Sequence, residues 1–261
     1  MNEEQRQIRK ARLKKGIYVL PNLFTTASLF SGFYSIIASV QEKFYIAAVA
    51  VLVSVVFDSL DGRVARMTNS TSKFGAEYDS LSDLIAFGMA PALLAYIWAM
   101  SFYGRLGWMA GFLFVLCGAL RLARYNIQIG LIESKVFNGL PIPAAAGVIA
   151  TTVIFLDDLG IDYGTFHSPF IMVLVFALSV LMVSNIKYYS GKDMKLFSRM
   201  PFMTFLVLVG ILLIIIYKPE VMFFVIFVGY ALSGPIWWLL KFIQKMRQKD
   251  LKPNDVSSKE S

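Results

Sequence analysis

Four aspartates set close together in an otherwise apolar stretch are the residues of this sequence most able to do chemistry. They are Asp58, Asp61, Asp79 and Asp83. A carboxylate inside a membrane-spanning helix costs about 2.5–3.5 kcal/mol even on the mildest scale, so residues of this kind are functional by default. Asp58 and Asp61 are three residues apart, and Asp79 and Asp83 are four apart. Each pair therefore shares one face of a helix.

The two pairs are expected to meet, because the connection over residues 63–78 is short. Two carboxylates about 4 Å apart repel each other by about 4 kcal/mol at an effective dielectric constant of about 20, so protons or cations must relieve the repulsion. Oxygen ligands on rigid helices suit Mg²⁺ or Mn²⁺. Two such ions about 3.5–4 Å apart are a common arrangement for displacement at phosphorus. The acids therefore predict a two-metal site for phosphoryl transfer.

The residues beside the acids fit a substrate that carries phosphate. Gly62 and Gly75 place no side chain there, which lets a pyrophosphate approach the backbone. Arg66 follows about one turn after Gly62 and offers a planar fork to phosphate oxygens. Simpler interpretations stay open for single residues. Asp79 also suits a helix N-terminus, and Arg63 and Arg66 also suit anchors at the membrane surface.

A proton or ion relay through a transporter is the main rival to an enzyme, because transporters also place acids in their spans. Such relays favour acids near the middle of the membrane on separate spans. The four aspartates here all lie near one predicted surface. That placement favours an enzyme that meets a water-soluble partner.

The spacing of these residues resembles the signature of the CDP-alcohol phosphotransferase family, D-x-x-D-G-x-x-A-R, eight residues, then G-x-x-x-D-x-x-x-D. The matching positions are Asp58, Asp61, Gly62, Ala65, Arg66, Gly75, Asp79 and Asp83. The resemblance implies that the first three aspartates bind metal, and that Asp83 binds the second metal and acts as the general base. It also implies a homodimer and a six-helix core over about residues 20–190. The implied contacts to the CDP-lipid are Asn22, Thr25, Gly62, Arg66, Ser72 and Gly75.

Three segments look like the phosphatidylserine synthase branch of this family: residues 21–25, 121–126 and 137–144. That likeness implies CDP-diacylglycerol as the donor and L-serine as the acceptor, with Arg121, Arg124 and Asn126 as acceptor contacts. Arg121 and Arg124 are three residues apart, so they can clamp a carboxylate together. The alternative is that both snorkel to the lipid headgroups. Glycerol phosphate or inositol stays open as the acceptor.

Composition predicts an all-α integral membrane protein. The chain is 57% hydrophobic and 16% charged, with a mean hydropathy of +0.63, whereas soluble domains are about 45–50% apolar and about 25% charged. The apolar residues gather in runs long enough to cross about 30 Å of hydrocarbon. They predict eight spans, at residues 21–40, 44–65, 80–103, 106–127, 140–157, 168–186, 201–217 and 220–240.

The net charge of +8 reflects the orientation of the chain in the membrane. Most Lys and Arg residues fall in the tails and in one alternate set of loops, which predicts that both termini and the acidic cluster lie in the cytosol, at the cell's inner membrane. This distribution excludes a nucleic-acid face. We expect a basic juxtamembrane helix over residues 1–19, the family core over 20–190, two further spans over 191–240 and a polar tail over 241–261.

Several single residues have simple structural interpretations. Cys117 lies in an apolar run and is expected to be inert, and His167 is the one histidine and is isolated. Pro21 and Asn22 are typical of a helix start, and residues 139–143 of the turn before a helix. Gly107 and Gly111 form a GxxxG spacing, which favours close helix packing, with a dimer contact as the alternative.

Overall fold

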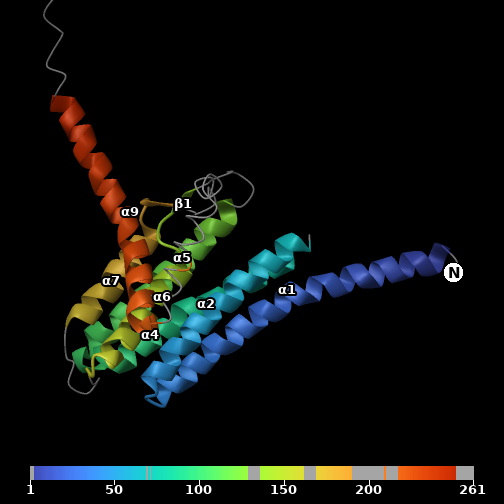
Figure 1. Cartoon of the computed structure of the whole chain (residues 1–261), viewed down its shortest axis with the longest axis horizontal. Helices are drawn as coiled ribbons and strands as arrows, with labels where there is room; N and C mark the ends of the chain where they lie inside the picture. Colours follow the sequence, from blue (N-terminus) through green and yellow to red (C-terminus); the bar gives the residue numbers. More distant parts are fainter. Residues whose placement is uncertain are drawn as a thin grey trace, which may run out of the picture.

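The computed structural model describes residues 3–68, 70, 72–128, 136–161, 169–189, 209 and 217–250. Within these ranges the chain is mostly helical (Figure 1). The long helices are α1 (Glu3–Val40), α2 (Phe44–Met67), α5 (Arg105–Gln128), α6 (Ile142–Asp158), α7 (Pro169–Val183) and α9 (Pro219–Asp250). Between α2 and α5, five short helical segments follow one another: α3 (Lys73–Asp83), η1 (Leu84–Met89), α4 (Ala90–Ala95), η2 (Tyr96–Met100) and η3 (Ser101–Tyr103).

In the described part of the chain, five helices are long and apolar enough, by length and composition, to cross a membrane: Leu20–Val40, Phe44–Met67, Lys73–Tyr103, Arg105–Ile127 and Pro219–Gln244. Each corresponds to a predicted span. Large apolar side chains such as Phe30, Phe112 and Phe176 are exposed on the outside of the bundle, as lipid contact requires. The predicted helical fold, with several helices able to cross a membrane, is therefore confirmed. The count of eight spans stays a prediction, since the span over 201–217 lies outside the described residues except 209 and 217.

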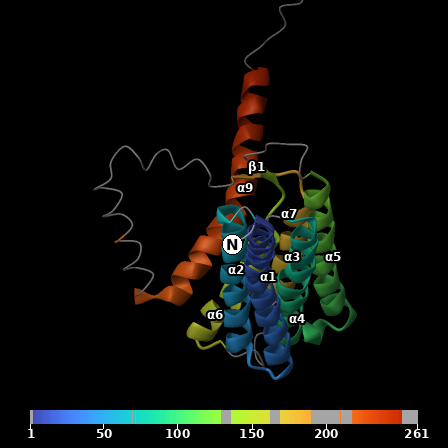
Figure 2. The same ribbon diagram turned by 90° about the vertical axis from the view of Figure 1, so that its right-hand side faces the viewer.

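Figures 1 and 2 show the helical bundle from two sides, with α6 next to α2. Most of α6 is buried, and it contacts α2 on one side and α9 on another. Small residues allow the close approach: a Cβ on Gly147 would lie only 2.1 Å from the ring of Phe227. α1 packs along α2, and α5 packs along α7. The acidic end of α2 is thereby placed between α1 and the third span.

Hydroxyl groups and a glycine fix α1 against its neighbours. The Ser28 hydroxyl lies 3.0 Å from that of Ser54, and Ser31 donates to the carbonyl of Ala50 at 2.8 Å. On another face, a Cβ on Gly32 would lie 2.5 Å from the Cα of Ala86 in η1. These contacts fix the position of α1 along its axis, relative to the aspartates on α2 and α3.

The expectation that a helix begins at Pro21 is wrong. α1 begins at Glu3 and continues to Val40, with Pro21 inside it. Residues 3–19 are therefore helical, as expected for the basic segment, but they form one rod with the first span (Figure 1). Proline removes a single backbone donor, so one missing hydrogen bond does not end the helix, and α1 packs on α2 and on the third span.

The third span is not a uniform α-helix. It contains two π-helical segments, η1 and η2, on either side of α4. π-bulges widen a helix locally and often occur near functional sites, and η1 begins directly after Asp83. Close packing surrounds this region: a Cβ on Gly107 would lie 2.0 Å from the carbonyl oxygen of Met100. The packing interpretation of Gly107 is thus confirmed within the described part of the chain.

A two-stranded ribbon, which the sequence did not predict, joins the segment before the start of α6 to the segment after the end of α7. β1 (Val136–Asn138) and β2 (Lys187–Tyr189) pair antiparallel, with Phe137 opposite Tyr188. Strands of three residues carry no recognisable alternation, so they form only because the fold brings them together. Gly139 follows β1 with a φ of +81°, a conformation that favours glycine. α6 then starts after Pro141, which confirms the predicted turn before this helix.

Candidate active site

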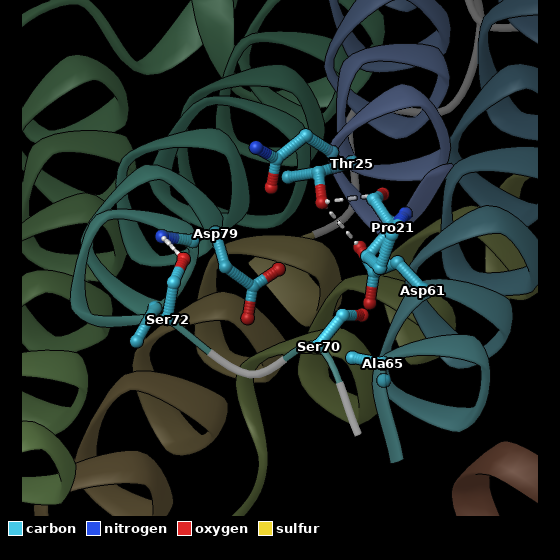
Figure 3. A pocket seen from close by; sticks show the side chains of 11 residues that line it. Pro21, Thr25, Asp61, Ala65, Ser70, Ser72 and Asp79 are labelled. Atoms are coloured by element: carbon cyan, nitrogen blue, oxygen red, sulfur yellow. Dashed lines mark hydrogen bonds between the residues drawn. The ribbon is translucent and has the colours of Figure 1, made fainter. Parts of the chain in front are cut away.

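The end of α2 and the start of α3 bring three carboxylates together. One oxygen from each of Asp58, Asp61 and Asp79 lies within 4.8 Å of the others. Ser72 sets where α3 begins, since it is the N-cap and its hydroxyl accepts from the backbone N–H of Gly75 at 2.9 Å. Ordinary helix geometry then turns Asp79 toward the end of α2 (Figure 3). The predicted convergence of these three acids is thus present.

Asp83 joins the cluster through Asp58. The carboxyl groups of these two residues lie within hydrogen-bonding reach of each other, and Asp83 is one turn further along α3 than Asp79. Asp83 therefore lies beside Asp58, at the junction between α3 and η1.

The cluster contains more acceptors than donors. Asp61 is 6% exposed, and its Oδ2 accepts from the Thr25 hydroxyl at 2.8 Å. Oδ1 of Asp79 is buried and has no hydrogen-bond partner among the described residues. A buried carboxylate oxygen without a donor is costly, and like charges this close repel. A divalent cation fits this arrangement, because it supplies the positive charge and takes hard oxygen ligands.

A pocket of about 150 Å³ opens beside Asp61 and Asp79 (Figure 3). It is lined by Pro21, Asn22, Thr25, Asp61, Gly62, Ala65, Ser70, Ser72, Gly75, Ala76 and Asp79. Five of the six residues predicted to bind the CDP-lipid are among them. Arg66, the sixth, lies on the exposed end of α2, about one turn beyond Gly62.

The two glycines of the pocket differ in what surrounds them. A Cβ on Gly62 would meet no atom within 4 Å, so this position faces open space. A Cβ on Gly75 would lie 3.1 Å from the hydroxyl oxygen of Ser72 and 3.4 Å from Oδ1 of Asn22. Gly62 leaves room for a ligand, as expected, whereas Gly75 also lets α1 approach α3.

The sequence did not single out Ser70 or Ala76 as pocket residues. Ser70 is 5% exposed, and its hydroxyl lies 2.6 Å from that of Thr68. Ser70 lies between α2 and α3, outside both helices. Helical spacing therefore could not predict that its side chain lines the pocket. Ala76 belongs to the first turn of α3, so its place follows from the N-cap at Ser72.

The three predicted acceptor contacts separate in the structure. Arg121 is 9% exposed and near enough to Asp83 and Asp58 for their charges to interact. Arg124 instead donates from Nη1 to Oδ1 of Asn185, beyond the end of α7, at 3.3 Å. Asn126 donates from Nδ2 to the hydroxyl of Ser80 in α3 at 2.9 Å. Arg121 is thus buried next to the acids, whereas the other two tie α5 to neighbouring segments.

Comparison with known proteins extends these observations. Residues 18–178 match the CDP-alcohol phosphatidyltransferase family. The chain is 40% identical over 235 residues to a CDP-diacylglycerol–serine O-phosphatidyltransferase of Helicobacter pylori (strain ATCC 700392 / 26695), covering 90% of this chain and 97% of the relative. An archaetidylserine synthase of Methanothermobacter thermautotrophicus is 43% identical over 171 residues, or 65% and 69% of the two chains. A serine O-phosphatidyltransferase of Saccharomyces cerevisiae is 38% identical over 144 residues, covering 50% and 51%.

Proposed function

This chain belongs to the CDP-alcohol phosphatidyltransferase family, and on that premise we propose that it transfers the phosphatidyl group of CDP-diacylglycerol to the hydroxyl of L-serine. The products are phosphatidylserine and CMP. Two serine-using relatives from Helicobacter pylori cover 90% of this chain. In the structure, one observation carries the proposal: a buried arginine, Arg121, lies beside the carboxylate cluster.

The four aspartates would hold two divalent cations, either Mg²⁺ or Mn²⁺. Asp58, Asp61 and Asp79 would be ligands of the first, and Asp83 would be a ligand of the second. When bound, the cations offset negative charge that develops on the phosphate oxygens during displacement. The protein's own contribution is to hold its carboxylates on rigid helices, with Asp61 oriented by the hydrogen bond from Thr25.

Asp83 would act as the general base. Its carboxylate takes the proton of the acceptor hydroxyl, and the oxygen attacks the β-phosphorus of the CDP-lipid. A new bond forms between the serine oxygen and that phosphorus, and the bond from the phosphorus to the bridging oxygen breaks. CMP leaves with the bonding electrons. Asp83 is well placed for this role, because its carboxyl group lies beside that of Asp58 and near Arg121.

The pocket beside Asp61 would receive the cytidine diphosphate part of the donor. Asn22, Thr25, Gly62, Ser72 and Gly75 line it. Arg66, on the exposed end of the same helix, would bind phosphate oxygens from the rim. The acyl chains would stay in the bilayer, next to the exposed apolar side chains of the bundle.

Arg121, rather than Arg124, is our candidate for the serine carboxylate. With the aspartates neutralised by divalent cations, the Arg121 guanidinium is left as a buried cation without a counter-charge. A buried charge is costly until it is paired, and the carboxylate of the acceptor would pair with it. In serine, only two carbon atoms separate the carboxylate carbon from the hydroxyl oxygen. A carboxylate held at Arg121 would therefore bring the hydroxyl close to Asp83.

We also propose the membrane orientation, span arrangement and assembly that the sequence predicts. Both termini and the site would face the cytosol at the inner membrane, since the cations gather on that side. The family core would span residues 20–190, followed by two further spans and a polar tail. The working unit would be a homodimer in the lipid bilayer, with no nucleic-acid partner.

The proposal is tested by an acceptor panel. Purified protein in detergent is given CDP-diacylglycerol and one alcohol at a time: L-serine, ethanolamine, glycerol phosphate or inositol. We expect CMP release with L-serine and little with ethanolamine, which is serine without its carboxylate. Turnover with glycerol phosphate or inositol that equals the serine rate would overturn the assignment of serine, while leaving the family chemistry in place.

A further inference from the structure

Arg121 has a neighbour that comes from outside the part of the chain matched by the family. Besides Asp83 and Asp58, Tyr125 on its own helix and Tyr230 on α9 lie near enough to the guanidinium to affect it electrostatically. The guanidinium carbon lies 5.9 Å from the centre of the Tyr125 ring. The family match ends at residue 178, so α9 brings a residue near Arg121 that the match does not include.

Tyr230 is held by a second tyrosine, Tyr188 of β2. The ring centres are 5.8 Å apart, at an interplanar angle of 41°. Tyr188 is fully buried, and its hydroxyl donates to the carbonyl of Ala231 at 3.0 Å. Burial raises the pKa of Tyr188 to about 12, so the phenol keeps its proton and remains a donor at neutral pH. The bond ties β2 to the residue that follows Tyr230.

Close packing makes the contact between α9 and Tyr188 of β2 rigid. A Cβ on Gly234 would lie 2.4 Å from the ring of Tyr188, so α9 approaches β2 as closely as a glycine allows. The other strand of the ribbon pairs Phe137 with Tyr188. The ribbon in turn connects to the start of α6, where the N–H of Gly139 donates to the carbonyl of Ile186 at 2.9 Å. These contacts lead from the ribbon through Tyr188 to α9, which carries Tyr230 near Arg121.

We infer that Tyr230 is a positioning residue for Arg121, and that the contact between α9 and β2 fixes its place, so that the C-terminal helix sets the affinity for the acceptor amino acid. This inference rests on the proposed role of Arg121. A long arginine side chain loses much rotamer freedom when it binds a carboxylate. Aromatic neighbours that restrict it beforehand reduce that loss, which strengthens binding.

The test uses the purified 261-residue chain in detergent, with CDP-diacylglycerol and L-serine. Tyr230→Phe keeps the ring and removes the hydroxyl. We expect the KM for serine to rise by about 2- to 12-fold, the effect of one lost polar contact, while kcat and the KM for CDP-diacylglycerol stay within about twofold. Tyr188→Phe, which loses the bond to Ala231, should move the serine KM in the same direction. Tyr45→Phe, on the exposed surface of α2, should change neither constant.

Coupling to Arg121 separates positioning from a general effect on the fold. In an Arg121→Ala background, Tyr230→Phe should no longer change the serine KM, because the residue through which it acts is gone. An equal rise in both backgrounds overturns the inference, and so does an unchanged serine KM for Tyr230→Phe when Arg121→Ala alone raises it. If Arg121→Ala itself leaves the serine KM unchanged, the proposed acceptor site fails and the inference fails with it. A thermal unfolding curve for each variant checks that the protein remains folded.

Discussion

At the scale of single residues, each aspartate of the cluster has a different set of neighbours. Asp61 accepts a hydrogen bond from Thr25, Asp79 has a buried oxygen without a donor among the described residues, and Asp83 lies beside Asp58 and near Arg121. Four residues of one type thus have environments that suit different roles. The roles proposed above follow from these differences and from the family to which the chain belongs.

The metal-binding role predicts that an amide cannot replace these carboxylates. Asp58→Asn, Asp61→Asn and Asp79→Asn should each lower CMP release by at least about 100-fold, since ligand charge is lost where phosphate charge must be offset. Removing one of several repelling carboxylates should leave thermal unfolding unchanged or shift it upward. Variants that keep more than about a tenth of the activity would contradict the assignment. Asp158→Asn, exposed at the other end of the bundle, is the control.

The two arginines of α5 give a matched pair for the acceptor. Arg121→Ala should raise the KM for serine by about 10- to 150-fold, because a charge-assisted contact of this type contributes about 1.5–3 kcal/mol. The KM for CDP-diacylglycerol should change by no more than a few-fold. Arg121→Lys should rescue only in part, since lysine lacks the planar fork. Arg124→Ala should leave the serine KM near its original value, because Arg124 contacts Asn185 instead. The reverse pattern would transfer the role to Arg124.

At the scale of elements, helix packing determines how far α1 lies from the third span. Gly32 is the closest point, 2.5 Å from the Cα of Ala86 for an added Cβ, and that neighbour is backbone. Gly32→Ala should therefore destabilise the protein by about 1–3 kcal/mol, measured as a lower midpoint of thermal unfolding. Gly229→Ala adds the same methyl group where no atom lies within 4 Å. It should leave the midpoint unchanged or raise it. Equal midpoints for the two variants would disprove this packing account.

Apolar runs and helical spacing predicted the long helices and the convergence of the aspartates, because both are local properties of the chain. The passage of α1 through Pro21, the π-helical segments and the β1–β2 ribbon were not predicted. Each depends on contacts between segments far apart in the sequence. The same holds for the separation of Arg121 from Arg124. Both lie at helical spacing, and only their neighbours distinguish them: Asn185 after α7 for Arg124, and residues of α2, α3 and α9 for Arg121.

At the scale of the whole molecule, the proposed orientation places the acidic end of α2 and α3 in the cytosol. In a Cys117→Ser background, a cysteine at exposed Lys73 should react with a membrane-impermeant thiol reagent only from the cytosolic side. A cysteine at exposed Asp158, at the end of α6, should react only from the opposite side. Labelling of both positions from one side would refute the orientation of the bundle and the cytosolic site together.

The central claim is that the carboxylate cluster transfers a phosphatidyl group from CDP-diacylglycerol to L-serine. The most direct measurement follows CMP and labelled phosphatidylserine together, using purified protein, isotopically labelled L-serine and CDP-diacylglycerol in detergent. We expect one CMP for each phosphatidylserine. We also expect both products to be lost with a chelator, to return with Mg²⁺ or Mn²⁺, and to be lost in Asp83→Asn. Full turnover in the chelator, or CMP release at the same rate without serine, would contradict the central claim.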